Sequence, residues 1–163
     1  MSSSLLSDST VAFIQREVAI DMASCSSDLR PSGCRGFAPR LTPDRARLTL
    51  YVRQQEADQL LQDVQIQDVV AVVFCLPETE AAIQIKGRQV RVAPVTPDEA
   101  DQVMRYCQTF VDGIVKLGYD RQFGETYMHV DPTRLMAVSF TPEQVFEQTP
   151  GPRAGRAMHG GHA

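Results

Sequence analysis

Residues 30–40 read Arg-Pro-Ser-Gly-Cys-Arg-Gly-Phe-Ala-Pro-Arg, and they open the part of the chain that decides the fold. Two apolar runs follow, Arg-Leu-Thr-Leu-Tyr-Val at 47–52 and Asp-Val-Val-Ala-Val-Val-Phe at 68–74, before Ala-Ile-Gln-Ile-Lys-Gly-Arg-Gln-Val-Arg-Val at 82–92. Short runs rich in β-branched residues and bounded by turn residues are typical of strands. Arginines stand near the ends of these runs, so the stretch predicts a small β-barrel with an anion-binding rim.

Further strands are expected on both sides of this stretch. Residues 18–24 indicate a first strand, and residues 135–141 a last one, followed by a helical turn over 142–146. Within the strand at 33–41, Pro39 predicts an edge position or a bulge, because proline lacks the N–H that a strand ladder needs.

Two helices are expected where apolar residues recur three and four positions apart, at 56–64 and 97–117. Thr96 and Glu99 fit a capping box at the start of the longer helix, and Gly118 fits its end. The resulting order is β-β-β-α-β-β-α-β, which favours a closed antiparallel barrel over a doubly wound sheet. The expected fold class is therefore mainly β with helices (α+β).

The length of 163 residues predicts one domain. We expect this domain to span 11–147. A Ser-rich segment at 1–10 precedes it, and a tail at 148–163 that is rich in glycine and proline follows it. Both ends are expected to be flexible, because they contain too few apolar groups to fold alone.

The composition indicates which classes of binding partner are not expected. The net charge is −4 and the basic residues form no long run, so nucleic-acid binding is not expected. The four cysteines lack the spacing of a zinc site, and no metal site is predicted. Neither a signal peptide nor an apolar run of about 18 residues is visible, which predicts a cytoplasmic protein without a membrane partner.

The residue order and a few positions resemble the pyridoxamine 5′-phosphate oxidase-like, FMN-binding split-barrel superfamily, over roughly residues 11–146. In that family an arginine-bearing strand follows a Pro-Ser turn, as Arg35 and Arg40 follow residues 31–32 here. A glutamine on a later strand contacts the flavin, and Gln84 matches it. The resemblance implies a split β-barrel, antiparallel and Greek-key-like, that forms a homodimer and builds its FMN site from both subunits.

The chain departs from the family pattern after the third strand. A Ser/Thr-x-x-Ser-x-Lys cluster usually grips the phosphate there, whereas this chain reads Val-Arg-Gln-Gln-Glu-Ala-Asp at 52–58. Arg53 is the one cation offered, with two carboxylates close by in sequence, and like charges disfavour a bound phosphate. The predicted cofactor-binding residues are Arg35, Arg40, Arg53, Gln84 and Lys86, and for each the alternative is a solvated side chain.

Two functions stay open at this point. The first is an FMN-dependent oxidoreductase that acts on a small-molecule substrate, and no catalytic side chain is predicted because the cofactor supplies the chemistry. The alternative is a non-enzymatic ligand-binding or regulatory protein that has lost FMN, or one that binds haem through a histidine such as His129. The aromatic residues Tyr119, Phe123 and Tyr127 are expected to cover a ligand, meet a partner subunit or pack under a loop.

Overall fold

The computed structural model describes residues 5–158, and its centre is a closed six-stranded barrel. The strands follow the order β1-β2-β3-β6-β5-β4 around the barrel, and each neighbouring pair is antiparallel. Their bounds are β1 (Ala19–Cys25), β2 (Pro31–Leu41), β3 (Leu48–Arg53), β4 (Val70–Cys75), β5 (Ala82–Pro94) and β6 (Leu135–Glu147). The structure thus confirms the expected α+β class and the antiparallel barrel.

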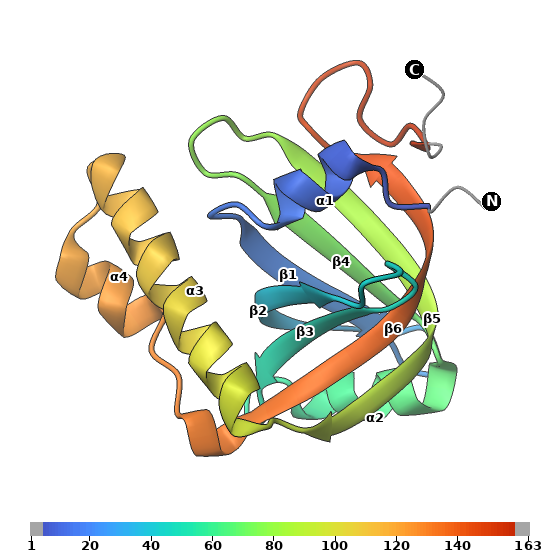
Figure 1. Cartoon of the computed structure of the whole chain (residues 1–163). Helices are drawn as coiled ribbons and strands as arrows, with labels where there is room; N and C mark the ends of the chain where they lie inside the picture. Colours follow the sequence, from blue (N-terminus) through green and yellow to red (C-terminus); the bar gives the residue numbers. More distant parts are fainter. Residues whose placement is uncertain (1–4, 159–163) are drawn as a thin grey trace.

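Four α-helices and a 3-10 turn surround the barrel in the described part of the chain (Figure 1). They are α1 (Asp8–Ile14), α2 (Asp58–Gln67), α3 (Pro97–Lys116), α4 (Arg121–Tyr127) and η1 (Pro132–Arg134). The long helix α3 begins with the predicted capping box of Thr96 and Glu99 and gives way to Gly118, which adopts a φ of 97°. Figure 1 shows α3 and α4 side by side on one flank of the barrel.

The barrel interior is filled by alternate residues of the strands. Leu48, Leu50 and Val52 of β3 point inward together with Val138 and Phe140 of the neighbouring β6, and all five are fully buried. Successive side chains of a strand point to opposite faces, so one register of each strand supplies the core. Apolar burial of this kind is the main favourable contribution to folding.

A second apolar cluster lies outside the barrel, between β2, β3 and α3. Phe37 and Tyr51, which are opposite each other in the β2–β3 ladder, contribute to it from the barrel wall. Cys107, Phe110 and Val111 contribute from α3. Helix α3 therefore buries the centre of the outer face of the β2–β3 pair. Residues farther along the same face lie next to α3 and α4.

Two strands are bulged where the sequence contains Pro39 and Gly87. The β2–β3 register shifts between Phe37 and Arg40, as predicted, and Ala38 there has a φ of 45°. The β5–β6 register shifts between Lys86 and Gly87. A Cβ at Gly87 would lie 2.3 Å from Cδ2 of Phe140, so only glycine allows this close approach.

One predicted element is wrong. Residues 142–146 were expected as a helical turn, but they continue β6, where Gln144 pairs with Lys86 and Val145 with Ile85. These residues form a strand because they pair with β5, and Pro142 is tolerated at its position in the strand. This proline lies next to the register shift at Gly87, where the ladder is already irregular.

Residues 148–158 return to the barrel after β6. The Met158 N–H donates to the Val145 carbonyl at 2.7 Å, and the Gly155 N–H donates to the Glu147 carbonyl at 2.7 Å. Met158 also packs against the barrel core. The expected flexible segments at 1–10 and 148–163 stay a prediction, and their ends at 1–4 and 159–163 lie outside the described residues.

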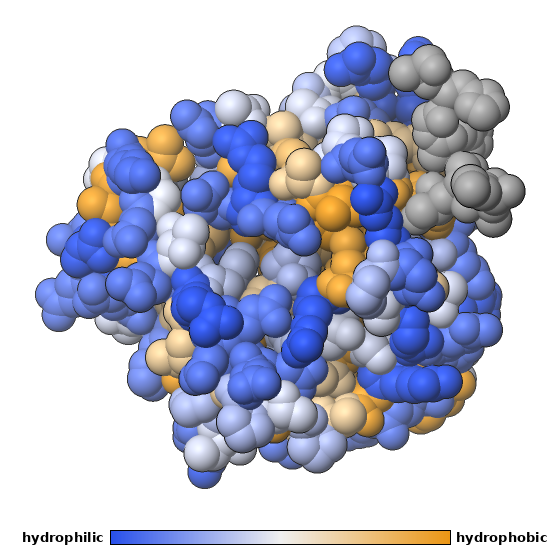
Figure 2. Space-filling model, in the orientation of Figure 1, coloured by the Kyte–Doolittle hydropathy of each residue, from blue (hydrophilic) through white to orange (hydrophobic). Residues whose placement is uncertain are grey.

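The surface in the view of Figure 2 is mainly hydrophilic, with hydrophobic residues in small groups. Of the helices within residues 5–158, none combines the length and the hydropathy that a membrane-spanning segment requires. The cysteines at 25, 34, 75 and 107 are all free thiols, and Cys107 is the one that is buried.

Candidate functional site

Arg35 and Arg53 lie on the neighbouring strands β2 and β3 and line the same cleft. Phe37 pairs with Tyr51 in the ladder, and Arg35 and Arg53 each lie two residues from this pair along their strands. Both arginines then share the outer face with Phe37 and Tyr51. Like charges close together on one face of a sheet destabilise it, so the pair must be compensated by its surroundings.

The guanidinium group of Arg35 is enclosed by aromatic rings. Its Cζ atom lies 5.0 Å from the ring centroid of Phe110 on α3 and 4.9 Å from that of Tyr127 on α4. Nη1 donates a hydrogen bond of 3.0 Å to the hydroxyl of Tyr127. These contacts hold a cation through ring quadrupoles and one neutral acceptor, rather than through a carboxylate.

Arg53 has a different set of partners. Its Nη1 atom lies 3.0 Å from both carboxylate oxygens of Glu56, and Nη2 donates to the carbonyl of Tyr127 at 2.6 Å. Its Cζ atom lies 4.9 Å from the ring centroid of Phe37. Arg53 is therefore paired with the carboxylate of Glu56. Its bond to the Tyr127 carbonyl also connects the end of α4 to the barrel.

Three N–H groups of this arginine pair have no hydrogen-bond partner among the described residues. They are Nε and Nη2 of Arg35 and Nε of Arg53, and all three are buried. Buried donors in folded proteins are nearly always paired with protein, water or an ion. The unpaired donors therefore mark a place where a bound anion or ordered water would complete the structure.

A cleft of about 690 Å³ adjoins the pair. Arg35 and Arg53 line it together with Tyr127, and the remaining lining residues are Asp21, Met22, Gly33, Cys34, Glu56 and Thr126. A neighbouring hollow of about 370 Å³ continues along Arg53, Glu56 and Thr126 to His129, Asp131 and Arg134. The two share three residues, so they form one polar groove along the edge of β3 and α4.

Two thiols lie near the arginine pair, the partly buried Cys34, which lines the groove, and the buried Cys107 on α3. Burial, followed by the carboxylates of Glu56 and Asp21, raises the pKa of Cys34 to about 12. Burial also raises the pKa of Cys107, to about 11, but there Arg53 and Arg35 act in the lowering direction. The guanidinium groups of Arg53 and Arg35 thus act on the pKa of Cys107, and the carboxylates of Glu56 and Asp21 act on the pKa of Cys34.

The other three predicted cofactor-binding residues lie away from this pair. Arg40 is exposed beyond the bulge of β2, where its Nη1 atom lies 3.8 Å from Glu99. Gln84 and Lys86 lie on β5, which is separated from β2 by two strands in either direction around the barrel. Gln84 accepts from Gln148 at 3.5 Å, and Lys86 lies 5.0 Å from the Phe146 ring. One chain therefore brings together Arg35 and Arg53 and does not bring Arg40, Gln84 or Lys86 to them.

Aromatic residues on α3 and α4 are part of the site, although the sequence did not assign them a definite role. The rings of Tyr119, Phe123 and Tyr127 form a stacked row, with centroid distances of 6.3 and 5.9 Å. The row is about half exposed and ends on Arg35. Phe123 and Tyr127 lie four residues apart on α4 and so share one face of that helix, whereas Tyr119 lies in the segment between α3 and α4.

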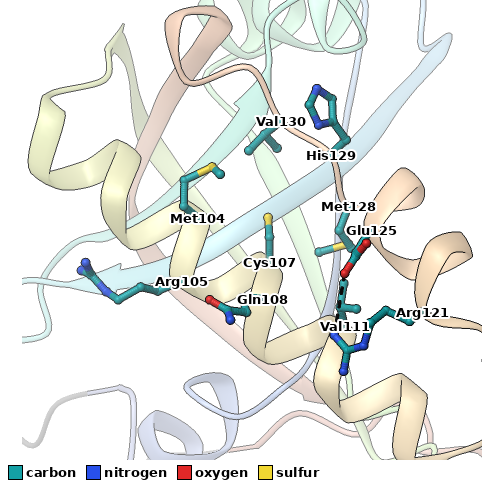
Figure 3. Close-up of a pocket in the computed structure, with 10 residues that line it drawn as sticks. All are labelled: Met104, Arg105, Cys107, Gln108, Val111, Arg121, Glu125, Met128, His129 and Val130. Atoms are coloured by element: carbon teal, nitrogen blue, oxygen red, sulfur yellow. Dashed lines mark ion pairs between the residues drawn. The ribbon is translucent and has the colours of Figure 1, made fainter.

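A separate cleft of about 370 Å³ lies between α3 and the segment that follows α4 (Figure 3). Met104, Cys107 and Val111 line it from α3, and Met128 and His129 line it from the opposite side. Figure 3 shows the His129 ring pointing away from the Cys107 thiol. His129 is exposed and lines both this cleft and the polar groove.

No family model and no curated protein matches the sequence. Solved structures do match the fold. An F420 reductase is 11% identical with a TM-score of 0.54 and covers 82% of this chain and 93% of its own. A putative pyridoxamine 5′-phosphate oxidase from Lactobacillus delbrueckii is 12% identical with a TM-score of 0.54, covering 90% and 97%. General stress protein 26 from Bacillus anthracis is 9% identical with a TM-score of 0.51, covering 91% and 94%.

These similarities extend over nearly the whole length of the matched proteins, and at such low identity they concern the fold. They agree with the closed antiparallel barrel described above. The chain has the split-barrel fold of the pyridoxamine 5′-phosphate oxidase-like proteins.

Proposed function

We propose that this protein binds FMN and acts as a flavin-dependent oxidoreductase on a small-molecule substrate. The observation that carries the proposal is the pair Arg35 and Arg53, with three buried and unpaired N–H donors beside a cleft of about 690 Å³. Guanidinium groups match phosphate oxygens in geometry and charge. The neighbouring folds support the same ligand class, since they include a putative pyridoxamine 5′-phosphate oxidase and an F420 reductase.

The residues present fit a phosphate better than they fit a purely apolar ligand. Arg35 and Arg53 would hold the phosphate, and the aromatic residues around them would keep both guanidinium groups in place. Bound FMN supplies the redox chemistry itself. The chain contributes orientation and charge, which agrees with the absence of any predicted catalytic side chain.

The proposal includes a homodimer. Gln84 and Lys86 face outward on β5, on the far side of the barrel from β2, so they can contribute to an FMN site only from a second subunit. Sedimentation velocity on the purified protein measures this directly. A monomer at micromolar concentration would remove Gln84 and Lys86 from the proposed site while leaving Arg35 and Arg53 in it.

The second candidate is a split-barrel protein that binds no flavin, and specific contacts favour it. Glu56 is paired with Arg53, and Asp21 lines the same cleft. Both carboxylates would repel a phosphate near Cys34. This protein would then be a ligand-binding or regulatory module, or would bind haem, for which His129 beside the cleft in Figure 3 is the candidate ligand.

An absorbance spectrum with an FMN titration separates these functions. Flavin absorbs near ~450 nm and haem near ~400 nm, because these bands belong to the cofactors. Quenching of FMN fluorescence with a sub-micromolar Kd supports the flavoprotein. No binding at roughly millimolar FMN, which corresponds to a free energy weaker than about −4 kcal/mol, contradicts it.

A further inference from the structure

The side chain of Tyr127 lies against the guanidinium group of Arg35. Its hydroxyl accepts from Nη1 of Arg35 at 3.0 Å, and its ring lies 4.9 Å from the guanidinium carbon. Tyr127 lines the same cleft as the two arginines. Tyr127 is therefore one of the two aromatic side chains that cover Arg35, and it is the one that lines the cleft.

The contacts of Tyr127 are weak substitutes for those of an anion. A neutral phenol oxygen accepts from Nη1, while Nε and Nη2 of the same guanidinium group stay unpaired among the described residues. Hydrogen bonds to a charged acceptor are about twice as strong as those to a neutral one. An anion that bound Nη1 as well as Nε and Nη2 would therefore displace the hydroxyl.

The side chain of Tyr127 is partly exposed, whereas its main chain is held. Tyr127 is 46% exposed, and beyond Arg35 its ring contacts the half-exposed ring of Phe123. Its carbonyl is held by Arg53 at 2.6 Å, and the next residue, Met128, is buried. A rotamer change of Tyr127 would open the site without moving α4.

We propose that Tyr127 is a self-inhibitory plug, whose side chain covers Arg35 in the free protein and swings out when a phosphorylated ligand binds. This inference rests on the proposed anion site at Arg35 and Arg53. The plug would lower the affinity of the site for anions, because every anion competes with the Tyr127 side chain for Arg35.

The matched test compares Tyr127→Ala with Tyr119→Ala. Both tyrosines belong to the aromatic row and are about half exposed, but only Tyr127 contacts the arginines. We expect Tyr127→Ala to tighten FMN binding about tenfold, as measured by fluorescence quenching, and Tyr119→Ala to leave it unchanged. Tyr127→Phe removes only the hydroxyl, so its gain should be smaller.

The side chain of Tyr127 can be observed directly by ¹⁹F NMR. The chain has four tyrosines, so 3-fluorotyrosine labelling gives four ¹⁹F resonances, and Tyr127→Phe assigns the one that disappears. Titration with inorganic phosphate or FMN should shift the Tyr127 resonance and leave that of Tyr119 in place. An unmoved Tyr127 resonance at saturating ligand overturns the proposal.

The outcomes separate the plug from the flavin function. If FMN binds and Tyr127→Ala is unchanged or weaker, the plug is wrong and the flavin site stands. If FMN fails to bind but phosphate moves the Tyr127 resonance and binds Tyr127→Ala more tightly, the plug stands and the flavin function is wrong. If neither ligand binds any variant, both are wrong.

Discussion

Arg53 and Tyr127 are 74 positions apart in the chain and are joined by a hydrogen bond of 2.6 Å from Nη2 to the main-chain carbonyl. This bond connects the end of β3 to the end of α4. It fixes where the aromatic row of α4 meets the barrel, and thereby where Arg35 is covered. The candidate site is assembled by this connection between two segments that sequence order keeps apart.

Replacing either arginine of the pair should weaken FMN binding. Arg35→Ala and Arg53→Ala are each expected to cost about 1.5–3 kcal/mol, the range for a hydrogen bond to a charged group. Arg40→Ala is the matched control, because Arg40 lies on the same strand but points to Glu99. Fluorescence titration measures all three. An equal loss in Arg40→Ala would show that the site extends beyond the bulge.

Gly87 should be intolerant of any side chain. A Cβ there would lie 2.3 Å from Phe140 and 2.4 Å from the Thr141 carbonyl, so Gly87→Ala is expected to destabilise the fold by about 3 kcal/mol. Gly113→Ala in α3 serves as control. Its Cβ would meet only Glu17 at 3.4 Å, and alanine favours a helix by about 0.5–1 kcal/mol. Urea unfolding of both variants checks the contrast, and equal stabilities would refute the tight contact.

The carboxylate of Glu99 should make stability depend on pH. Burial alone would raise its pKa, but hydrogen bonds from the Thr96 main chain and hydroxyl and from Tyr51 outweigh burial and lower it. The folded pKa therefore lies below the unfolded value of about 4.3, so the stabilisation is complete above that pH. It is lost as the pH falls through the folded pKa.

The comparison of wild type with Glu99→Gln tests this effect. Wild type should be the more stable protein at pH 7, and the difference in unfolding free energy should shrink as the pH falls below about 4. A difference that stays constant between pH 3 and pH 7 would mean that the charge of Glu99 contributes nothing.

Residues 150–158 should stabilise the barrel. The test compares a chain that ends at Thr149 with a chain that ends at Met158. The segment by which they differ includes the 2.7 Å bond from the Met158 N–H to the Val145 carbonyl and the contact of Met158 with the core. The shorter chain should lose roughly 1–2 kcal/mol from these hydrogen bonds. That corresponds to about 2–8 °C in Tm for a domain of this size. Equal melting temperatures would instead support a flexible tail.

Much of the barrel could be predicted from local patterns. The strand at 47–52, the helix at 97–117, the capping box at Thr96 and the bulge at Pro39 all depend on neighbours in sequence, and the structure contains each of them. The end of β6 was missed because its strand character comes from pairing with β5 rather than from its own residues.

The candidate site was harder to predict, because it also depends on contacts between segments that are far apart in sequence. Arg35 and Arg53 were recognised by their places on strands, but their pairing depends on the β2–β3 register, which a single strand does not reveal. The part played by Tyr127 depends on how α4 returns to the barrel, and no local pattern contains that path. Gln84 faces away from Ile83 and Ile85, as the alternation of a strand requires, but its place around the closed barrel depends on the strand order, which no local pattern contains.

The alternation of side chains along β3 has a consequence for evolution. Leu50 and Val52 point into the barrel, while their sequence neighbours Tyr51 and Arg53 point toward α3 and the groove. Selection on folding would act on the first pair and selection on ligand binding on the second. Among relatives, adjacent positions of one short strand should therefore change at different rates, and a change of ligand could be accepted at alternate positions without disturbing the barrel.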